Sequence, residues 1–105
     1  QRQMCIRDRN YDCTVILKGA GTIIAYPKRA YICPTGNPGM SKGGSGDVLS
    51  GIIASFRAQN IPDFAGVYIH GKAGDNAAVK HSMQGMLPTD IIDELTGIFK
   101  EYEKE

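Results

Sequence analysis

The chain has 105 residues, of which 42% are hydrophobic, and its formal net charge at pH 7 is +1. This length suits one small domain, and the near-neutral charge gives no electrostatic footprint for nucleic acid or for an anionic membrane. The three cysteines are odd in number and lack C-x-x-C spacing, which indicates neither a disulfide framework nor a zinc site and favours a reducing, cytoplasmic setting.

Residues 1–10, QRQMCIRDRN, contain three arginines and no apolar stretch, so they do not have the pattern of a secretory signal. The letters MCIRDR resemble translated sequencing adapter, and we expect this leader to be foreign to the fold. The domain prediction therefore separates a non-native leader, 1–10, from a folded part, 11–105. No stretch of the sequence is apolar for long enough to predict a membrane span.

Three short segments have the composition of β-strands. Residues 13–17 (CTVIL) and 22–26 (TIIAY) are rich in β-branched side chains, and residues 31–33 (YIC) form the third segment. The linker 18–21 (KGAG), taken alone, is typical of a hairpin turn. The third strand delivers the chain into a glycine-rich loop.

That loop begins at Thr35 and is followed by apolar residues with helical spacing. Leu49, Ile52, Ile53 and Phe56 fall at i, i+3, i+4 and i+7, which predicts one face of an α-helix. The first turn of a helix presents unpaired N–H groups and the positive end of the macrodipole, so it binds anions such as phosphate. The expected donors are the amides of Gly43, Gly44, Ser45 and Gly46.

Asp47 is the only carboxylate between Asp12 and Asp63, and it falls in this predicted first turn. A carboxylate there can simply cap the helix, which is worth roughly 0.3–1 kcal/mol. Beside a bound phosphate, however, a second negative charge is unfavourable unless it accepts a proton from the attacking group or orients that group. The surrounding glycines and the Asn37-Pro38-Gly39 turn favour this second interpretation.

The rest of the sequence predicts three helices. The first runs from about residue 44 to 59 and is ended by Asn60 and Pro62, and the second runs from near Pro62 to about Met83. The third has Thr89 or Asp90 as its N-cap and continues into the charged tail.

The second helix carries small residues on one face, and we interpret that face as packing. Asp75 and Asn76 could reach a ligand, but we expect them to be solvated. Residues 66–73 are one residue from a Walker A loop, yet Ala73 lacks the hydroxyl that would hold Mg²⁺ and the run has a helical pattern. His70 and His81 are too far apart along one helix to share a metal ion as an i, i+4 pair.

Three motifs carry a family resemblance. The run GNPGMSKGGSGDVLSGIIASFRAQ, preceded by LKGAGTIIA and followed by GVYIHGKAGDNAA, resembles the C-terminal part of the ADP/ATP-dependent NAD(P)H-hydrate dehydratases. These are metabolite-repair enzymes of the ribokinase-like superfamily, and the resemblance extends from about Cys13 to about Leu95. It implies an α/β fold, namely the C-terminal portion of a ribokinase-like sandwich, and therefore a fragment of the family's domain.

The same resemblance implies a lyase that uses ATP or ADP with Mg²⁺ to dehydrate hydrated NADH or NADPH. The ring hydroxyl would be phosphorylated and phosphate then eliminated, with Asp47 activating the hydroxyl and Asn37 also contacting the substrate. The nucleotide-binding residues implied are Lys18, Gly19, Ala20, Gly21, Thr22, Gly43, Gly44, Ser45 and Gly46. At positions 41–42 this chain has Ser-Lys where many relatives have Ala-Thr, and phosphate binding and simple solvation both stay open for Lys42.

Two alternative functions stay open: a small-alcohol kinase of the same superfamily, and an inactive nucleotide-binding fragment. A fragment of this fold leaves a sheet edge and an apolar helix face uncovered, so we expect the 105 residues alone to self-associate and to lack dehydratase activity. The expected partners are small molecules, neither nucleic acid nor membrane, with a homo-oligomer left open.

Overall fold

The computed structural model describes residues 15–17, 22–26 and 28–103. Its elements, in chain order, are β1 (Val15–Leu17), β2 (Ile23–Ala25), β3 (Ala30–Ile32), the 3-10 turn η1 (Pro38–Met40), α2 (Ser45–Ala58), α3 (Asp63–His81) and α4 (Pro88–Glu103). The predicted succession of short strands followed by helices is confirmed. The part of the predicted first strand before Val15 lies outside the described residues.

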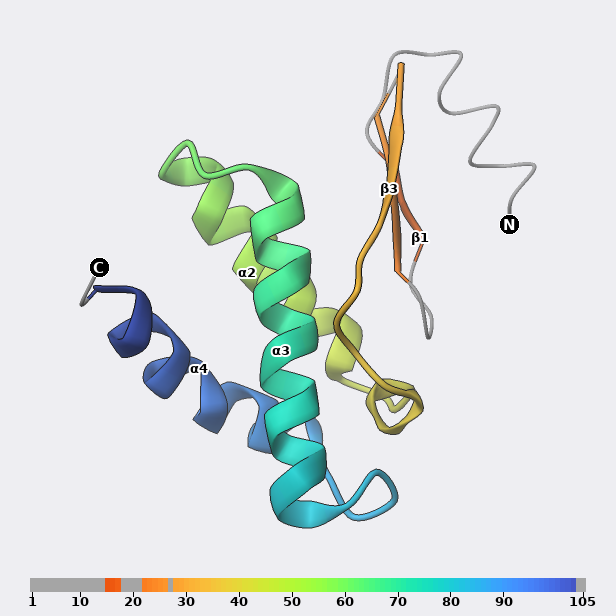
Figure 1. Ribbon diagram of the computed structural model, residues 1–105, viewed down its shortest axis with the longest axis vertical. Helices are drawn as coiled ribbons and strands as arrows, with labels where there is room; N and C mark the ends of the chain where they lie inside the picture. Colours follow the sequence, from red (N-terminus) through yellow and green to blue (C-terminus); the bar gives the residue numbers. More distant parts are fainter. Residues whose placement is uncertain (1–14, 18–21, 27, 104–105) are drawn as a thin grey trace.

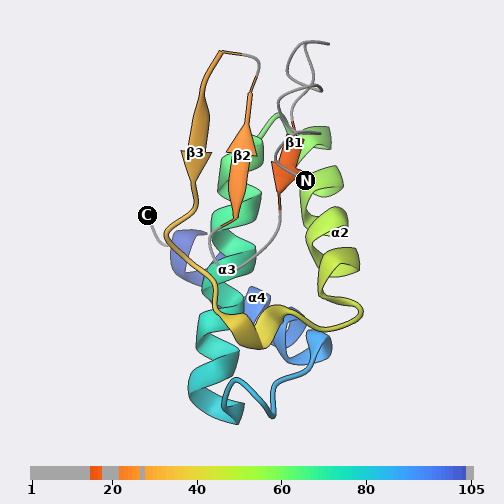
Figure 2. The same ribbon diagram turned by 90° about the vertical axis from the view of Figure 1, so that its right-hand side faces the viewer.

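The three strands form one antiparallel sheet in the order β1-β2-β3. Ile24 of β2 is opposite Ile16 on one side and Tyr31 on the other, so these three residues share one face of the sheet. Ile24 is 1% exposed and packs with Leu49 of α2 and Val67 of α3. The sheet therefore rests on α2 and α3, as Figure 2 shows.

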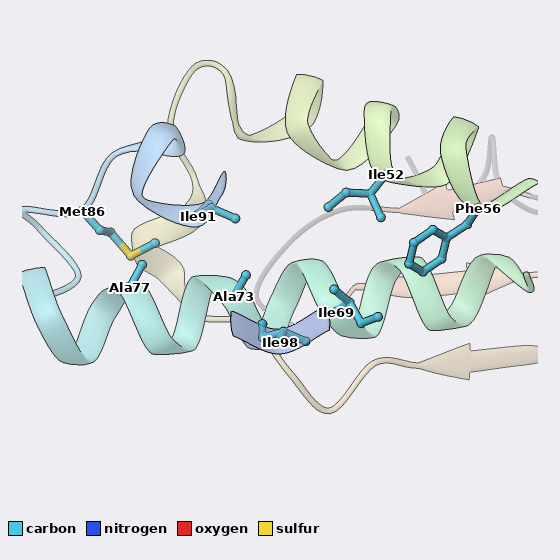
Figure 3. Packing of buried hydrophobic residues seen from close by; sticks show 8 residues of the cluster. All are labelled: Ile52, Phe56, Ile69, Ala73, Ala77, Met86, Ile91 and Ile98. Atoms are coloured by element: carbon cyan, nitrogen blue, oxygen red, sulfur yellow. The ribbon is translucent and has the colours of Figure 1, made fainter. Parts of the chain in front are cut away.

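A second cluster of apolar side chains joins the three helices. In Figure 1, α3 runs through the middle of the molecule, with the sheet on one side and α4 across the other. Figure 3 shows the buried side chains that meet there: Ile52 and Phe56 from α2, Ile69, Ala73 and Ala77 from α3, Met86, and Ile91 and Ile98 from α4. The prediction that the small-residue face of α3 serves packing is confirmed, because Ala73 and Ala77 are fully buried.

The predicted N-cap of the third helix is wrong. Helix α4 begins at Pro88, so Thr89 and Asp90 lie inside its first turn. Proline has no N–H to lose at this position, and its fixed φ already suits a helix. Asp90 serves the helix start in another way, because its carboxylate accepts a 2.8 Å hydrogen bond from the backbone N–H of Leu87. None of the described helices combines the length and the apolar character needed to cross a membrane.

An ion pair ties the end of α2 to the start of α3. The Arg57 guanidinium donates to both carboxylate oxygens of Asp63, at 2.9 Å from Nε and 2.7 Å from Nη2. The Asp63 side chain is 9% exposed, whereas that of Arg57 is 60% exposed. The hydrogen bond from Arg57 holds the pKa of Asp63 below its ordinary value, and the Coulomb attraction to Arg57 acts in the same direction against the opposing effect of burial.

We expect Arg57→Met to lower the free energy of unfolding at pH 7 by about 1 kcal/mol or less, because the partly exposed pair is screened by solvent. The folded-state pKa of Asp63 is depressed, so the pair's contribution is complete above the unfolded pKa of about 4 and is lost as the pH falls through the folded pKa. Urea denaturation of wild type and variant between neutral pH and pH ~2.5 measures this. If the free energies of unfolding of wild type and variant differed by the same amount at every pH in that range, the ion pair could not be the source of the difference.

Candidate functional site

The N-terminus of α2 is built by a turn that glycine makes possible. Gly44 is the N-cap and has φ 101°, a left-handed conformation that side-chain-bearing residues avoid. The turn uses one of the amides expected to bind an anion, because the Ser45 N–H donates to the Lys42 carbonyl at 3.2 Å. The Ser45 N–H is thus engaged within the turn, and the role of Ser45 in nucleotide binding stays a prediction. Within the described part of the chain, the amides of Gly43, Gly44, Gly46 and Asp47 have no acceptor.

A cavity of about 300 Å³ lies beside this helix start. Four of the predicted site residues line it together: Thr22, Asn37, Ser45 and Gly46. They come from the start of β2, the loop after β3 and the first turn of α2, which Figure 2 shows converging below the sheet. The predicted residues Lys18, Gly19, Ala20 and Gly21 lie outside the described residues.

Among these residues, Ser45 has a buried hydroxyl group that points to a bound ligand. It is 5% exposed, and its hydroxyl has no hydrogen-bond partner among the described residues. A buried hydroxyl without a partner costs free energy of about 1–3 kcal/mol, so such groups in folded proteins generally meet a ligand or water. Because Ser45 lines the cavity, its hydroxyl is available to a molecule bound there.

Asp47 occupies the third position of α2, in the first turn as predicted, and is exposed. It is not among the residues that line the cavity, whereas the neighbouring Gly46 is. Gly46 itself lies in the helix, and the glycines with positive φ in the described part are Gly36 and Gly44. Among the residues whose amides are predicted to bind phosphate, Gly44 is therefore the one whose backbone conformation requires a glycine.

The loop that borders the cavity is held by Asp75 of α3. Its carboxylate accepts hydrogen bonds from the Gly36 N–H at 3.1 Å and from the Asn37 side-chain amide at 2.9 Å. The Asn37 side-chain oxygen in turn accepts from the Gly39 N–H at 2.9 Å and caps η1. Asp75 is thus half-buried and bonded, contrary to the expectation that it is solvated.

Glycines of α3 bring the same loop close to the helix. A Cβ atom at Gly71 would lie 2.2 Å from the Thr35 hydroxyl oxygen, and one at Gly74 would lie 2.2 Å from the Met40 sulfur. Atoms do not approach that closely, so Gly71 requires glycine unless the Thr35 backbone moves, whereas at Gly74 the flexible end of the Met40 side chain would have to shift. The loop therefore packs closely against α3 because Gly71 and Gly74 have no side chains at the contact.

Sequence reasoning missed several residues around the cavity, chiefly Thr35, His70 and Gly71. The sequence suggests no role for His70 beyond the excluded metal pair with His81, yet in the structure His70 is buried and lines the same cavity as Ser45. No local pattern in the sequence marks His70 or Gly71, because both meet the cavity through the packing of α3 against the loop that contains Thr35.

The donors present suit a metal ion that is held mainly by a ligand. The described part of the chain contains no group of three or more His, Cys, Asp or Glu residues that could hold a metal by themselves. Mg²⁺ is commonly bound by one or two carboxylates together with substrate phosphates. A Mg²⁺ ion at this site would therefore be held mainly by the phosphates of a bound nucleotide.

Comparison with known proteins gives a consistent result. The family model described as NAD(P)H-hydrate dehydratase matches residues 2–97. The bifunctional NAD(P)H-hydrate repair enzyme Nnr of Moorella thermoacetica is 45% identical over 102 residues, covering 92% of this chain and 19% of the relative. The ADP-dependent (S)-NAD(P)H-hydrate dehydratase of Enterococcus faecalis is 41% identical over 93 residues, covering 85% of this chain and 31% of the relative.

The solved structures agree with the sequence relatives. The ADP/ATP-dependent NAD(P)H-hydrate dehydratase of Bacillus subtilis, co-crystallised with ATP/Mg²⁺ and soaked with CoA, matches with a TM-score of 0.86 and 27% identity. The match covers 96% of this chain and 39% of that one. A ribokinase-like superfamily protein of Enterococcus faecalis matches with a TM-score of 0.79 and 34% identity. The chain therefore has part of the ribokinase-like fold and spans well under half the length of these proteins.

Proposed function

The chain belongs to the NAD(P)H-hydrate dehydratase family, and on that premise we propose that its protein uses ATP or ADP to dehydrate hydrated NADH and NADPH. This reaction restores the damaged cofactor. The observation that carries the proposal to this chain is the Ser45 hydroxyl, which is buried, has no partner in the described part of the chain and lines a cavity at a helix N-terminus.

The chemistry of the helix start suits a phosphoryl group. The amides of Gly43, Gly44, Gly46 and Asp47 lack acceptors in the described residues, and the helix dipole places partial positive charge at the same point. Donors that are already oriented stabilise charge as it develops during transfer, without the cost of reorganisation. We assign the transferring phosphoryl group to this turn and propose that the Ser45 hydroxyl donates to a phosphate oxygen.

We assign the general base to Asp47. Its carboxylate would take the proton from the substrate's ring hydroxyl as the hydroxyl oxygen attacks the phosphoryl group, and the nucleotide would leave with one phosphate fewer. The new phosphate ester would then lose phosphate, which takes the electron pair of the carbon–oxygen bond, while the adjacent carbon releases a proton to water and its C–H electron pair forms the ring double bond. Mg²⁺, when bound with the nucleotide, supplies charge neutralisation on the phosphates.

The decisive experiment follows both products. The full-length protein is incubated with ATP, Mg²⁺ and hydrated NADH, and recovery of NADH is measured together with release of inorganic phosphate. The proposal expects the two to appear in equal amounts. A phosphorylated product that persists, without recovery of NADH, would instead identify a kinase.

The anion site has its own test in Gly46→Val. The branched side chain would occupy space at the cavity wall and shield the amides of the first turn, so ATP binding should weaken more than ~10-fold, a loss of over ~1.4 kcal/mol. Titration calorimetry with ATP measures the affinity, and circular dichroism checks that α2 remains folded. The matched control is Gly51→Val in the same helix, where an added Cβ meets no atom within 4 Å among the described contacts. Equal affinities in the two variants would remove Gly46 from the site.

A further inference from the structure

A pair of polar side chains, Asn37 and Asp75, joins the loop after β3 to α3. The Asn37 amide nitrogen donates to one carboxylate oxygen of Asp75 at 2.9 Å. The Asn37 amide oxygen accepts the Gly39 N–H, also at 2.9 Å. An ionised carboxylate only accepts hydrogen bonds and a backbone N–H only donates, so these two partners together fix which way the amide faces. Both polar atoms of the Asn37 side chain are therefore engaged within the protein.

The Asp75 carboxylate also holds the loop at a second point. Its other oxygen accepts the Gly36 N–H at 3.1 Å. Hydrogen bonds to an ionised group are roughly twice as strong as those between neutral groups. An amide in place of this carboxylate would offer an oxygen to one of the two loop donors and present its NH₂ group to the other. Two acceptor oxygens on one side chain of α3 thus fix two successive residues of the loop.

The loop fixed in this way forms one wall of the cavity at the start of α2. Gly36 and Asn37 line that cavity from the loop, and Ser45 and Gly46 line it from the helix. Asp75 is half-buried and is not among the lining residues. Its carboxylate therefore acts on a molecule bound in the cavity through the position of the loop.

We propose that Asp75 is a positioning residue for the ligand in this cavity, and that Asn37 serves the bond to Asp75 rather than a contact of its side chain with the substrate. The inference rests on the proposed function, which brings ATP and the hydrate to this site. The loop wall should lose its position when an amide no longer faces a carboxylate. Asp47 lies in the first turn of α2, outside the pair, so the chemical step should be little affected.

Two single substitutions in the full-length protein disturb the pair in different ways. Asn37→Asp sets two carboxylates against each other, and like charges at contact distance repel. Asp75→Asn removes the charge and leaves one loop donor facing an NH₂ group. Each should raise the KM for ATP and for hydrated NADH about tenfold, the scale of a lost charge-assisted hydrogen bond, and change kcat by less than about threefold. A purely structural role would instead reduce the amount of folded enzyme and leave KM unchanged.

The sharpest variant exchanges the two residues by combining Asn37→Asp with Asp75→Asn. The amide at position 75 would then donate to the carboxylate at position 37 and accept the Gly36 N–H. The second carboxylate oxygen at position 37 would accept the Gly39 N–H, so every bond of the wild-type pair has a counterpart. We expect both KM values to return to within about threefold of wild type, which a double-mutant cycle reports as coupling between the two positions.

Matched controls make the same chemical changes at exposed positions. Asn60→Asp and Asp93→Asn lie outside the cavity lining and should leave KM and kcat unchanged. Hydrogen exchange of the Gly36 and Gly39 amides, measured without nucleotide, reports on the loop itself. It should be faster in both single variants and slow again in the exchanged variant. If the wild type neither binds ATP nor restores NADH, the proposed function fails, while these exchange rates still decide whether the pair fixes the loop.

Three results would overturn the proposal. One is a single variant with the KM values of wild type, and another is a loss confined to kcat. The third is an exchanged variant no better than the weaker single variant, which would return Asn37 to direct contact with the substrate. Should a single variant not fold, the folding and the KM values of the exchanged variant decide. Failure of all three variants to fold would count against a pair whose role is to position the ligand.

Discussion

In the full-length protein, Asp47→Asn is expected to lower the turnover of hydrated NADH with ATP by at least ~10²-fold, the usual scale of general-base catalysis. Asparagine keeps the size of the side chain and remains acceptable near a helix start, so α2 should form normally. Affinity for ATP should hold or rise, because a negative charge beside the phosphates has been removed. Single-turnover measurement of NADH recovery, together with calorimetry for ATP, separates the two effects.

The matched control for that substitution is Asp93→Asn. Asp93 is also an exposed aspartate of a helix, but it lies in α4, away from the cavity-lining residues. The control should leave turnover and ATP affinity unchanged. Comparable turnover in wild type and Asp47→Asn would restrict Asp47 to a capping role, worth only about 0.3–1 kcal/mol of stability.

The elements of the fold could be predicted because local patterns determine them. The i, i+3, i+4, i+7 spacing of Leu49, Ile52, Ile53 and Phe56 predicts α2, and in the structure Leu49, Ile52 and Phe56 are buried. The strands followed from their β-branched composition, and each lies within one residue of its predicted segment where the structure describes it. The start of the helix near residue 44, after a glycine loop, was predicted for the same local reason, whereas the structure alone shows that Gly44 is its N-cap with a positive φ.

Contacts between distant segments could not be predicted in this way. Asp75 lies 38 positions after Asn37 in the sequence, and nothing near either residue indicates the bond between them. The same holds for Lys42, whose ammonium group donates to carbonyl oxygens that lie 41 to 44 positions later in the sequence, namely those of Met83, Gln84 and Met86. The sequence indicates a contact with phosphate because Lys42 lies beside the predicted phosphate site, whereas its contact with backbone carbonyl oxygens is seen only in the folded chain.

The strongest test of the packing beneath the site is Gly71→Ala. A Cβ at this position would lie 2.2 Å from the Thr35 hydroxyl oxygen and 2.7 Å from the Thr35 carbonyl carbon, so the backbone of the loop must move. Thr35 cannot simply rotate away without losing its 2.8 Å hydrogen bond to the Tyr68 carbonyl. We expect a loss of about 1–3 kcal/mol in the free energy of unfolding, measured with urea.

Gly51→Ala is the control, because the same methyl group at Gly51 meets no atom within 4 Å among the described contacts. Alanine favours a helix over glycine by about 0.8–1 kcal/mol, so this variant should be more stable than wild type. If the free energy of unfolding falls in Gly71→Ala and rises in Gly51→Ala, the loss at Gly71 comes from the contact with Thr35 and not from helix propensity. Because Thr35 and Gly71 both line the cavity, Gly71→Ala should also weaken ATP binding, whereas Gly51→Ala should not. A stabilised Gly71→Ala variant with unchanged affinity would show that the loop does not rest on α3 as closely as the structure places it.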